Sequence, residues 1–161
     1  MKKLILTLST LLVTISSYSQ HQTISVNGIE LDKKHTQSQI YNILGIPKSI
    51  KPDESEPWLS WYYYNNSSFA FGHEDWELLD CKIKDTTYKV NNYLTVGMHS
   101  DSIKEMKGYL IEDIDDDEIY MYWAPSKEYR DNVAYIQIII NKQTKIIKAI
   151  WLLTQKFQEY D

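Results

Sequence analysis

The chain of 161 residues contains a single cysteine, Cys81, and only five glycines and four prolines. One cysteine cannot form an internal disulfide, so packing alone must stabilise the fold. With so few glycines, the chain has no glycine-rich loop that could cradle phosphate groups. It also lacks the Gly-x-Ser-x-Gly motif, and Cys81 lies in a strand-like pattern that predicts a buried, inert thiol. We therefore expect no catalytic residue, no cofactor and no enzymatic activity.

A basic stripe is also missing, and the formal net charge is −5. Nucleic acid is excluded as an expected partner, because phosphate binding needs clustered lysine and arginine. The four histidines show none of the close pairings typical of a zinc site, so no metal is expected. A protein partner remains, and a basic one would fit the charge.

No apolar run approaches the ~20 residues that a membrane-spanning helix needs. Residues 1–19 instead read as a signal peptide, with Lys2 and Lys3, a short apolar stretch, and a small-x-small cleavage signal ending at Ser19. The alternative is an uncleaved anchor. We predict a protein that is exported, periplasmic or secreted, and not inserted in a membrane after cleavage.

What the chain does contain is 43% apolar residues, with 13 tyrosines and five tryptophans. Asn27-Gly28 between two alternating runs predicts a tight β-hairpin. Thr36 can cap a short helix whose apolar residues are Ile40, Ile43 and Leu44, and which ends at Gly45 and Pro47. After a polar link, residues 58–64, 67–71 and 78–84 have the composition of strands.

The same order then returns. A shift of 63 residues places Ile103 on Ile40, Met106 on Ile43 and Gly108 on Gly45, with His99 or Ser100 as the cap. An acidic link and strands at 118–123, 132–140 and 145–153 follow. This order predicts an internal duplication, with a first repeat at 20–92 and a second at 93–161, in one compact mature domain. The expected fold class is α+β: two tandem helix-plus-antiparallel-hairpin repeats, with short helices on one face of an antiparallel sheet.

This pattern resembles the tandem-repeat fold of the β-lactamase-inhibitor protein and of outer-membrane assembly lipoproteins of the SmpA/OmlA type. The residues that carry the resemblance are Thr36, Ile40, Leu44, Gly45, Pro47, Gly97, Met98, Ile103 and Gly108. The resemblance implies an exported, non-enzymatic protein that grips another protein with an aromatic sheet face. Three features depart from it: there are no cysteines for the inhibitor's disulfides, no lipobox cysteine, and no proline after Gly108.

Five acids in seven residues precede the second aromatic strand. Asp113, Asp115 and Asp117 match the first, third and fifth positions of a calcium loop, but Glu118 replaces the required glycine and Ala124 the bidentate glutamate. The run is therefore a solvated link, a partner-facing acidic patch, or a weak non-standard calcium site.

Alternation in the two aromatic strands places their side chains on both faces of a sheet, one of which must pack under the helices. The other face stabilises the sheet through cross-strand pairs or contacts a partner. The sequence leaves open which face is which. The candidate partner-binding residues are Trp58, Trp61, Tyr62, Tyr64, Asp115, Asp116, Asp117, Tyr120, Tyr122 and Trp123.

The preferred function is that of an inhibitor or immunity-type protein, since an acidic protein with an aromatic sheet suits capture of a basic toxin or enzyme. An envelope assembly or scaffold protein is the close alternative. A small hydrolase using Glu74 or Asp75 beside Trp76 is a third, although no carboxylate spacing demands it. Thr86 and Ser102 lie in tripeptides that resemble O-glycan acceptor sites.

Overall fold

The computed structural model describes residues 24–103, 108–124 and 132–156. Its main feature is one antiparallel sheet of eight strands, in the order β3-β4-β5-β6-β10-β9-β8-β7. A separate two-stranded hairpin, one α-helix and one 3-10 helix complete the described elements. The elements are β1 (Ser25–Val26), β2 (Ile29–Glu30), α1 (Gln37–Leu44), β3 (Ser49–Pro52), β4 (Leu59–Tyr64), β5 (Ser67–Gly72), β6 (Leu78–Ile83), η1 (Ser100–Ile103), β7 (Gly108–Ile114), β8 (Asp117–Ala124), β9 (Asn132–Asn141) and β10 (Ile147–Lys156).

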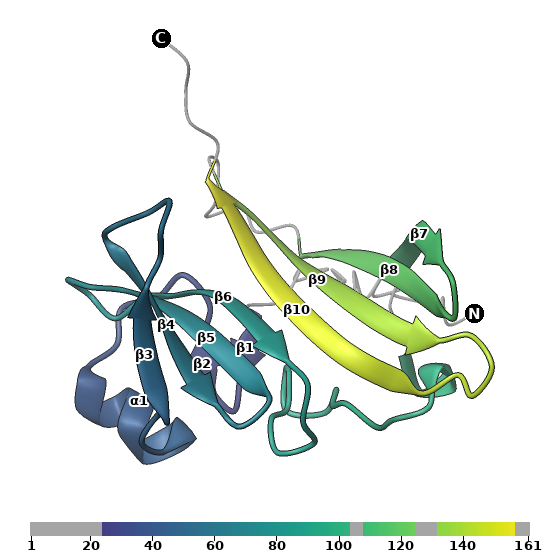
Figure 1. Ribbon diagram of the computed structural model, residues 1–161, viewed down its shortest axis with the longest axis horizontal. Coiled ribbons are helices and arrows are strands. Elements are labelled where there is room, and N and C mark those ends of the chain that lie inside the picture. The colour runs from purple at the N-terminus through teal and green to yellow at the C-terminus, as the bar shows by residue number, and fades with distance from the viewer. Residues whose placement is uncertain (1–23, 104–107, 125–131, 157–161) are drawn as a thin grey trace, which may run out of the picture.

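The sheet consists of two meanders joined along a seam. Strands β3 to β6 pair in sequence order, and so do β7 to β10. The seam between them is an antiparallel pairing of β6 with β10, which sets Ile83 opposite Ile150 and Cys81 opposite Leu152. Figure 1 shows β3 at one end of the sheet and β7 at the other.

The N-terminal elements follow the local signals of the sequence. Asn27 and Gly28 both adopt positive φ in the turn between β1 and β2. Thr36 caps α1 in a reciprocal capping box: its hydroxyl accepts from the Gln39 amide, and the Gln39 side chain accepts from the Thr36 amide. Gly45 ends the helix with φ 85° and donates its amide to the Tyr41 carbonyl. The predicted hairpin and first helix are confirmed.

The core lies against one face of the sheet, which we call the core face. Residues directly opposite on paired strands project to the same side, so Tyr62, Phe69, Cys81, Leu152 and Ile136 form one row across five strands. All five are buried. Their burial shows that this face carries the hydrophobic core.

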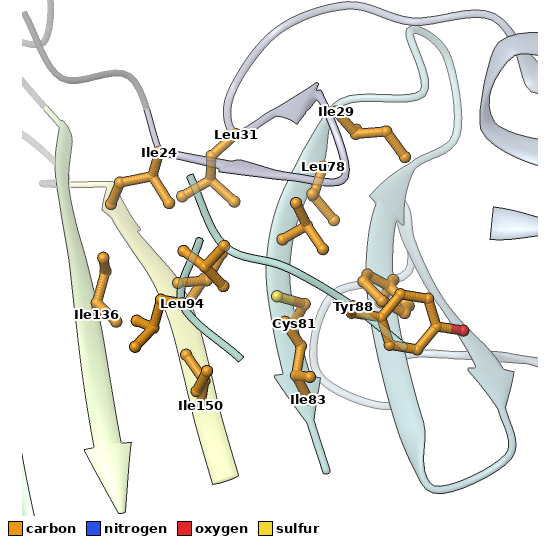
Figure 2. Close-up of a cluster of buried hydrophobic side chains, with 14 of the residues drawn as sticks. Ile24, Ile29, Leu31, Leu78, Cys81, Ile83, Tyr88, Leu94, Ile136 and Ile150 are labelled. Carbon is orange, nitrogen blue, oxygen red and sulfur yellow. The ribbon is translucent and has the colours of Figure 1, made fainter. Parts of the chain in front are cut away.

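Coil and hairpin cover much of the core face. The buried residues opposite the sheet are Ile24, Val26, Ile29 and Leu31 of the hairpin region, Ile40 and Leu44 of α1, and Tyr88, Val90, Leu94 and Ile103 of the segment between the meanders. In Figure 2, Ile24, Leu31 and Leu94 gather over Ile136 and Ile150. The connecting segment is therefore part of the core.

The predicted α+β class with two helix-plus-hairpin repeats is wrong. The described residues form mainly antiparallel sheet and contain one α-helix. In place of a second helix there is the four-residue 3-10 helix η1, followed by a strand from Gly108. Ser100, Asp101 and Ser102 favour caps and turns over helix interiors, because their side chains compete for backbone hydrogen bonds. The His99 ring accordingly accepts from the Asp101 amide.

Candidate binding face

The sheet face opposite the core, which we call the open face, carries large aromatic side chains that stay partly exposed. Its central residues are Trp61 and Tyr63 of β4, Lys82 of β6, Tyr135 of β9 and Trp151 of β10. The smaller residues Ser68, Ala70 and Ala149 on this face are buried among them. The open face thus spans both meanders and crosses the seam.

Lys82 makes cation–π contacts with two tryptophans of the open face, Trp61 and Trp151. Its ammonium nitrogen lies 5.1 Å from the ring centroid of Trp61 and 5.6 Å from that of Trp151. A cation over an indole face is attracted by the ring quadrupole, and this attraction is strongest for tryptophan. One lysine therefore contacts an aromatic residue of each meander, and each contact contributes roughly 0.5–1 kcal/mol because Lys82 is exposed.

Trp61 also makes a hydrogen bond to Asp53. The indole Nε1 of Trp61 donates to Asp53 Oδ2 at 2.8 Å. Asp53 Oδ1 accepts from the amides of Ser55 and Glu56, which closes the turn between β3 and β4. These bonds lower the pKa of Asp53, with the Trp61 bond as the main cause. The ring also packs on Leu59, Ala70 and Leu79.

Asp80, at one end of the open face, is a carboxylate with a raised pKa. Its Oδ1 accepts from the Thr154 amide at 3.0 Å, where the ladder between β6 and β10 has ended. The pKa of Asp80 is raised to about 6, mainly by burial and to a smaller extent by the nearby carboxylates of Glu56 and Asp53. The Thr154 bond and Lys82 lower it, but less than burial raises it. Asp80 is thus ionised at neutral pH, and within the described residues Lys82 is a partial counter-charge.

Replacing Asp80 with asparagine should stabilise the protein at neutral pH. A carboxyl whose pKa is raised on folding destabilises the native state above that pKa, by about 1.4 kcal/mol per pH unit of difference. This cost is absent below about pH 4, where both states are protonated, and complete above about pH 7. We expect Asp80→Asn to gain about 1–2 kcal/mol at pH 7.5 and almost nothing at pH 4, since the amide oxygen can still accept from Thr154.

Urea unfolding followed by tryptophan fluorescence at the two pH values measures this difference. Asp116→Asn is the matched control, because it removes the same charge from an exposed turn. A gain of the same size at pH 4 and pH 7.5 would show that titration of Asp80 is not the cause.

A shallow pocket lies at the end of β4 and β5. Its volume is about 400 Å³ and its lining is formed by Trp58, Gly72, His73, Glu74, Asp75 and Glu77. The Trp58 ring lies over Gly72, where a β-carbon would come within 3.7 Å of it. This is an ordinary van der Waals distance, so the position of the Trp58 ring does not depend on a glycine.

Beside the pocket, Ser60 contacts the lining residue His73, but the described residues supply no further part of a nucleophilic site. Ser60 Oγ lies 2.8 Å from His73 Nε2, yet Ser60 is only 7% exposed, so its hydroxyl has little access to a substrate. Asp75 is ion-paired with Lys34 at 2.5 Å. Nothing in this arrangement favours the hydrolase alternative with Glu74 or Asp75.

The candidate partner-binding residues predicted from the sequence do not all lie on one face of the sheet. Trp61 lies on the open face, and Trp58 is 44% exposed beside the pocket. Tyr62 and Tyr64 belong to the core at 7% and 4% exposure, and their rings contact Phe71 and Phe69 edge-on. These two tyrosines do not join Trp61 on the open face.

The acidic run forms a tight turn and not a long link. Asp115 and Asp116 connect β7 to β8 and are exposed, while Asp117 pairs with Lys148 at 2.6 Å. Tyr120 packs against the core. Tyr122 and Trp123 lie in β8, but their side chains are outside the described part of the chain. Whether the acidic turn contacts a partner stays a prediction.

Several residues of the open face were not singled out in the sequence. Lys82, Asp80, Tyr135 and Trp151 alternate with buried neighbours in β6, β9 and β10, and this alternation was the available signal. Cys81, between Asp80 and Lys82, was predicted to be buried, and it is. Burial also raises the pKa of its thiol, as expected of an inert cysteine.

No protein-family model matches the chain, and no curated protein matches it. The solved structures with weak similarity to the chain include two bacterial proteins. One is an extracellular protein containing a SCP domain from Bacillus anthracis str. Ames, with TM-score 0.47, 10% identity, and coverage of 76% of this chain and 44% of the other. The second is a cysteine-rich secretory protein from Staphylococcus aureus subsp. aureus Mu50, with TM-score 0.45, 16% identity, and coverage of 77% and 45%.

The chain therefore spans less than half the length of either protein, and no function transfers at such similarity. The expected resemblance to the β-lactamase-inhibitor protein and to SmpA/OmlA lipoproteins is wrong, since the similar structures are SCP-domain and cysteine-rich secretory proteins. That resemblance depended on short helix-end motifs, and the described part of the second motif, Ser100–Ile103, is a 3-10 helix. Both proteins are described as extracellular or secretory. No described helix has the length and apolar character needed to cross a membrane.

Proposed function

We propose that this is an exported, non-enzymatic protein-binding protein whose open face is the binding surface. One observation carries the proposal: Trp61 and Trp151 remain partly exposed on one sheet face, and the Lys82 ammonium lies over both rings. Tryptophan and tyrosine supply large contact area at low entropic cost and dominate the energetics of protein interfaces. Preorganisation lowers the cost of binding further, because fewer side chains must be ordered.

The role that fits this surface best is that of an inhibitor or immunity-type protein. A rigid sheet with fixed aromatic residues suits a stable one-to-one complex, and the acidic net charge suits a basic partner. An envelope assembly protein would use the same face. Nucleic acid is not expected as a partner, and the location is the periplasm or the medium outside the cell.

The test begins with chemical cross-linking of the mature protein in envelope and secreted fractions of the parent cell. The dissociation constant of the captured and purified partner is then measured for Trp61→Ala and Trp151→Ala. We expect each variant to bind at least about tenfold more weakly, since interface tryptophans typically contribute 2 kcal/mol or more.

Tyr93→Ala is the matched control. Tyr93 is exposed but lies in the segment that covers the core face, next to the buried Leu94. Equal affinities for the wild type and both tryptophan variants would refute the open face as the binding surface. Inhibition of an enzymatic activity of the partner at equimolar protein would favour the inhibitor role over assembly.

A further inference from the structure

The open face is not uniform in charge, and its acidic end indicates what the partner presents. Trp61 of β4, Ala70 of β5 and Asp80 of β6 form one cross-strand row on this face. Adjacent strands are about 4.8 Å apart, so Trp61 and Asp80 lie about 10 Å apart across the small Ala70. Asp53 is hydrogen-bonded to the Trp61 indole, and Glu56 follows in the same turn.

Lys82 is the cation that faces this end, and it only partly balances the acids. The ionised groups that act on Asp80 are Glu56 and Asp53 from the β3–β4 turn and Lys82 from its own strand. Among the described residues, the groups of the other two strands that act with Asp80 are neutral: the Thr154 amide of β10 and Tyr135 of β9. Lys51 of β3, opposite Trp61, adds a second ammonium, which lies over the Tyr63 ring. Among the described residues, three carboxylates against two ammonium groups leave an excess of negative charge beside a partly exposed indole.

We propose, building on the function proposed above, that this acidic end of the open face receives a lysine or arginine side chain of the protein partner. The cation would lie beside Trp61, near the carboxylates of Asp53, Glu56 and Asp80. An arginine suits this place best, because its fork of N–H groups donates to carboxylates, whereas the face of the Trp61 ring is already contacted by Lys82 at 5.1 Å. The bound cation adds its positive charge to that of Lys82, so Asp80 stays ionised in the complex.

This linkage makes recognition dependent on pH. Protonation of Asp80 removes one of the carboxylates that attract the cation, and its pKa of about 6 lies within the accessible range. If the complex holds Asp80 fully ionised, binding weakens by up to about tenfold between pH 7.5 and pH 5. A variant without the titrating group has no such dependence.

The probe is the peptide acetyl-Gly-Arg-Gly-amide, compared with its glutamine and glutamate counterparts and titrated against the full mature protein. The Trp61 indole signal and the Asp80 carboxyl signal are followed by NMR at pH 7.5 and pH 5. We expect saturable shifts with the arginine peptide only, weaker at pH 5, and largely lost in Asp80→Asn and Glu56→Gln. Asp116→Asn, which removes a remote acid, should bind the peptide as the wild type does.

Equal shifts with the glutamine peptide, stronger binding of the glutamate peptide, or unchanged binding by Asp80→Asn and Glu56→Gln would each overturn this inference. Loss of folding cannot mimic the expected result, because Asp80→Asn is expected to be the more stable protein. The captured partner separates this inference from the proposed function. If Trp61→Ala and Trp151→Ala weaken its binding while Asp80→Asn and Glu56→Gln do not, the open face remains the binding surface and only the cation is refuted.

Discussion

Replacing Phe69 with alanine is expected to lower the free energy of unfolding by about 3–5 kcal/mol, the usual cost of deleting a fully buried phenyl ring. Phe69 is fully buried in β5. The centroid of its ring lies 5.6 Å from that of Tyr64 in β4 and 5.0 Å from that of Tyr88 in the connecting segment, and both contacts are edge-on. Alanine leaves a cavity between strand and segment, and also removes the two aromatic contacts, each worth about 0.5–1.5 kcal/mol.

Chemical denaturation of wild type and variant measures this loss. Tyr63→Ala is the matched control, because Tyr63 is an aromatic residue of the neighbouring strand but faces outward and is partly exposed. We expect the control to lose less than half as much stability. A loss below about 1 kcal/mol for Phe69→Ala would contradict the placement of the core on this face.

The second large effect is expected at the seam between the meanders. Ile150 of β10 is fully buried and lies opposite Ile83 of β6 on one side and Ile138 of β9 on the other. Ile150→Ala should cost about 2–5 kcal/mol, because the cavity opens where the two halves of the sheet meet. In Figure 2 the Ile150 side chain lies below Leu94, in the group of side chains that closes the seam.

Leu153→Ala provides the comparison for the seam, since it removes a similar side chain from the same strand. Leu153 is only partly buried and points to the open face. We expect its loss to stay near 1 kcal/mol. Equal losses for the two variants would mean that the seam is not packed more tightly than the exposed side of β10.

Much of the local structure followed from the sequence. The hairpin at Asn27-Gly28 and the helix between Thr36 and Gly45 formed where predicted, because their turn and capping chemistry is contained within a few residues. The six predicted strands correspond to β4, β5, β6, β8, β9 and β10. Each of these strands has a neighbour on both sides in the sheet.

The two strands at the ends of the sheet, β3 and β7, are not predicted from the sequence. The polar link before residue 58 overlaps β3, and the acidic stretch before residue 118 contains most of β7. Strand β3 holds Lys51 and Pro52 and is exposed throughout, as is typical of an edge strand. Hydrophobic alternation detects strands that bury a face, so strands with little buried surface escape it.

The binding face could be predicted only in part. Alternation in residues 58–64 showed that Trp61 and Tyr62 face opposite sides, but the packing that selects the buried side comes from distant residues such as Tyr88 and Leu94. Lys82 and Trp151 become neighbours only through the pairing of β6 with β10. No local signal in either strand specifies that pairing.

The seam also bears on the order of folding. Within each meander, consecutive strands pair across short connections, whereas the bond from the Thr154 amide to Asp80 joins residues 74 positions apart. Loops of that length close at a higher entropic cost, so contacts across the seam are expected to form after the local hairpins. In the denaturation series, the stability lost by Ile150→Ala should then appear mainly as faster unfolding, and that lost by Phe69→Ala partly as slower refolding. The surface that unites Trp61 with Trp151 would accordingly be among the last parts of the molecule to assemble.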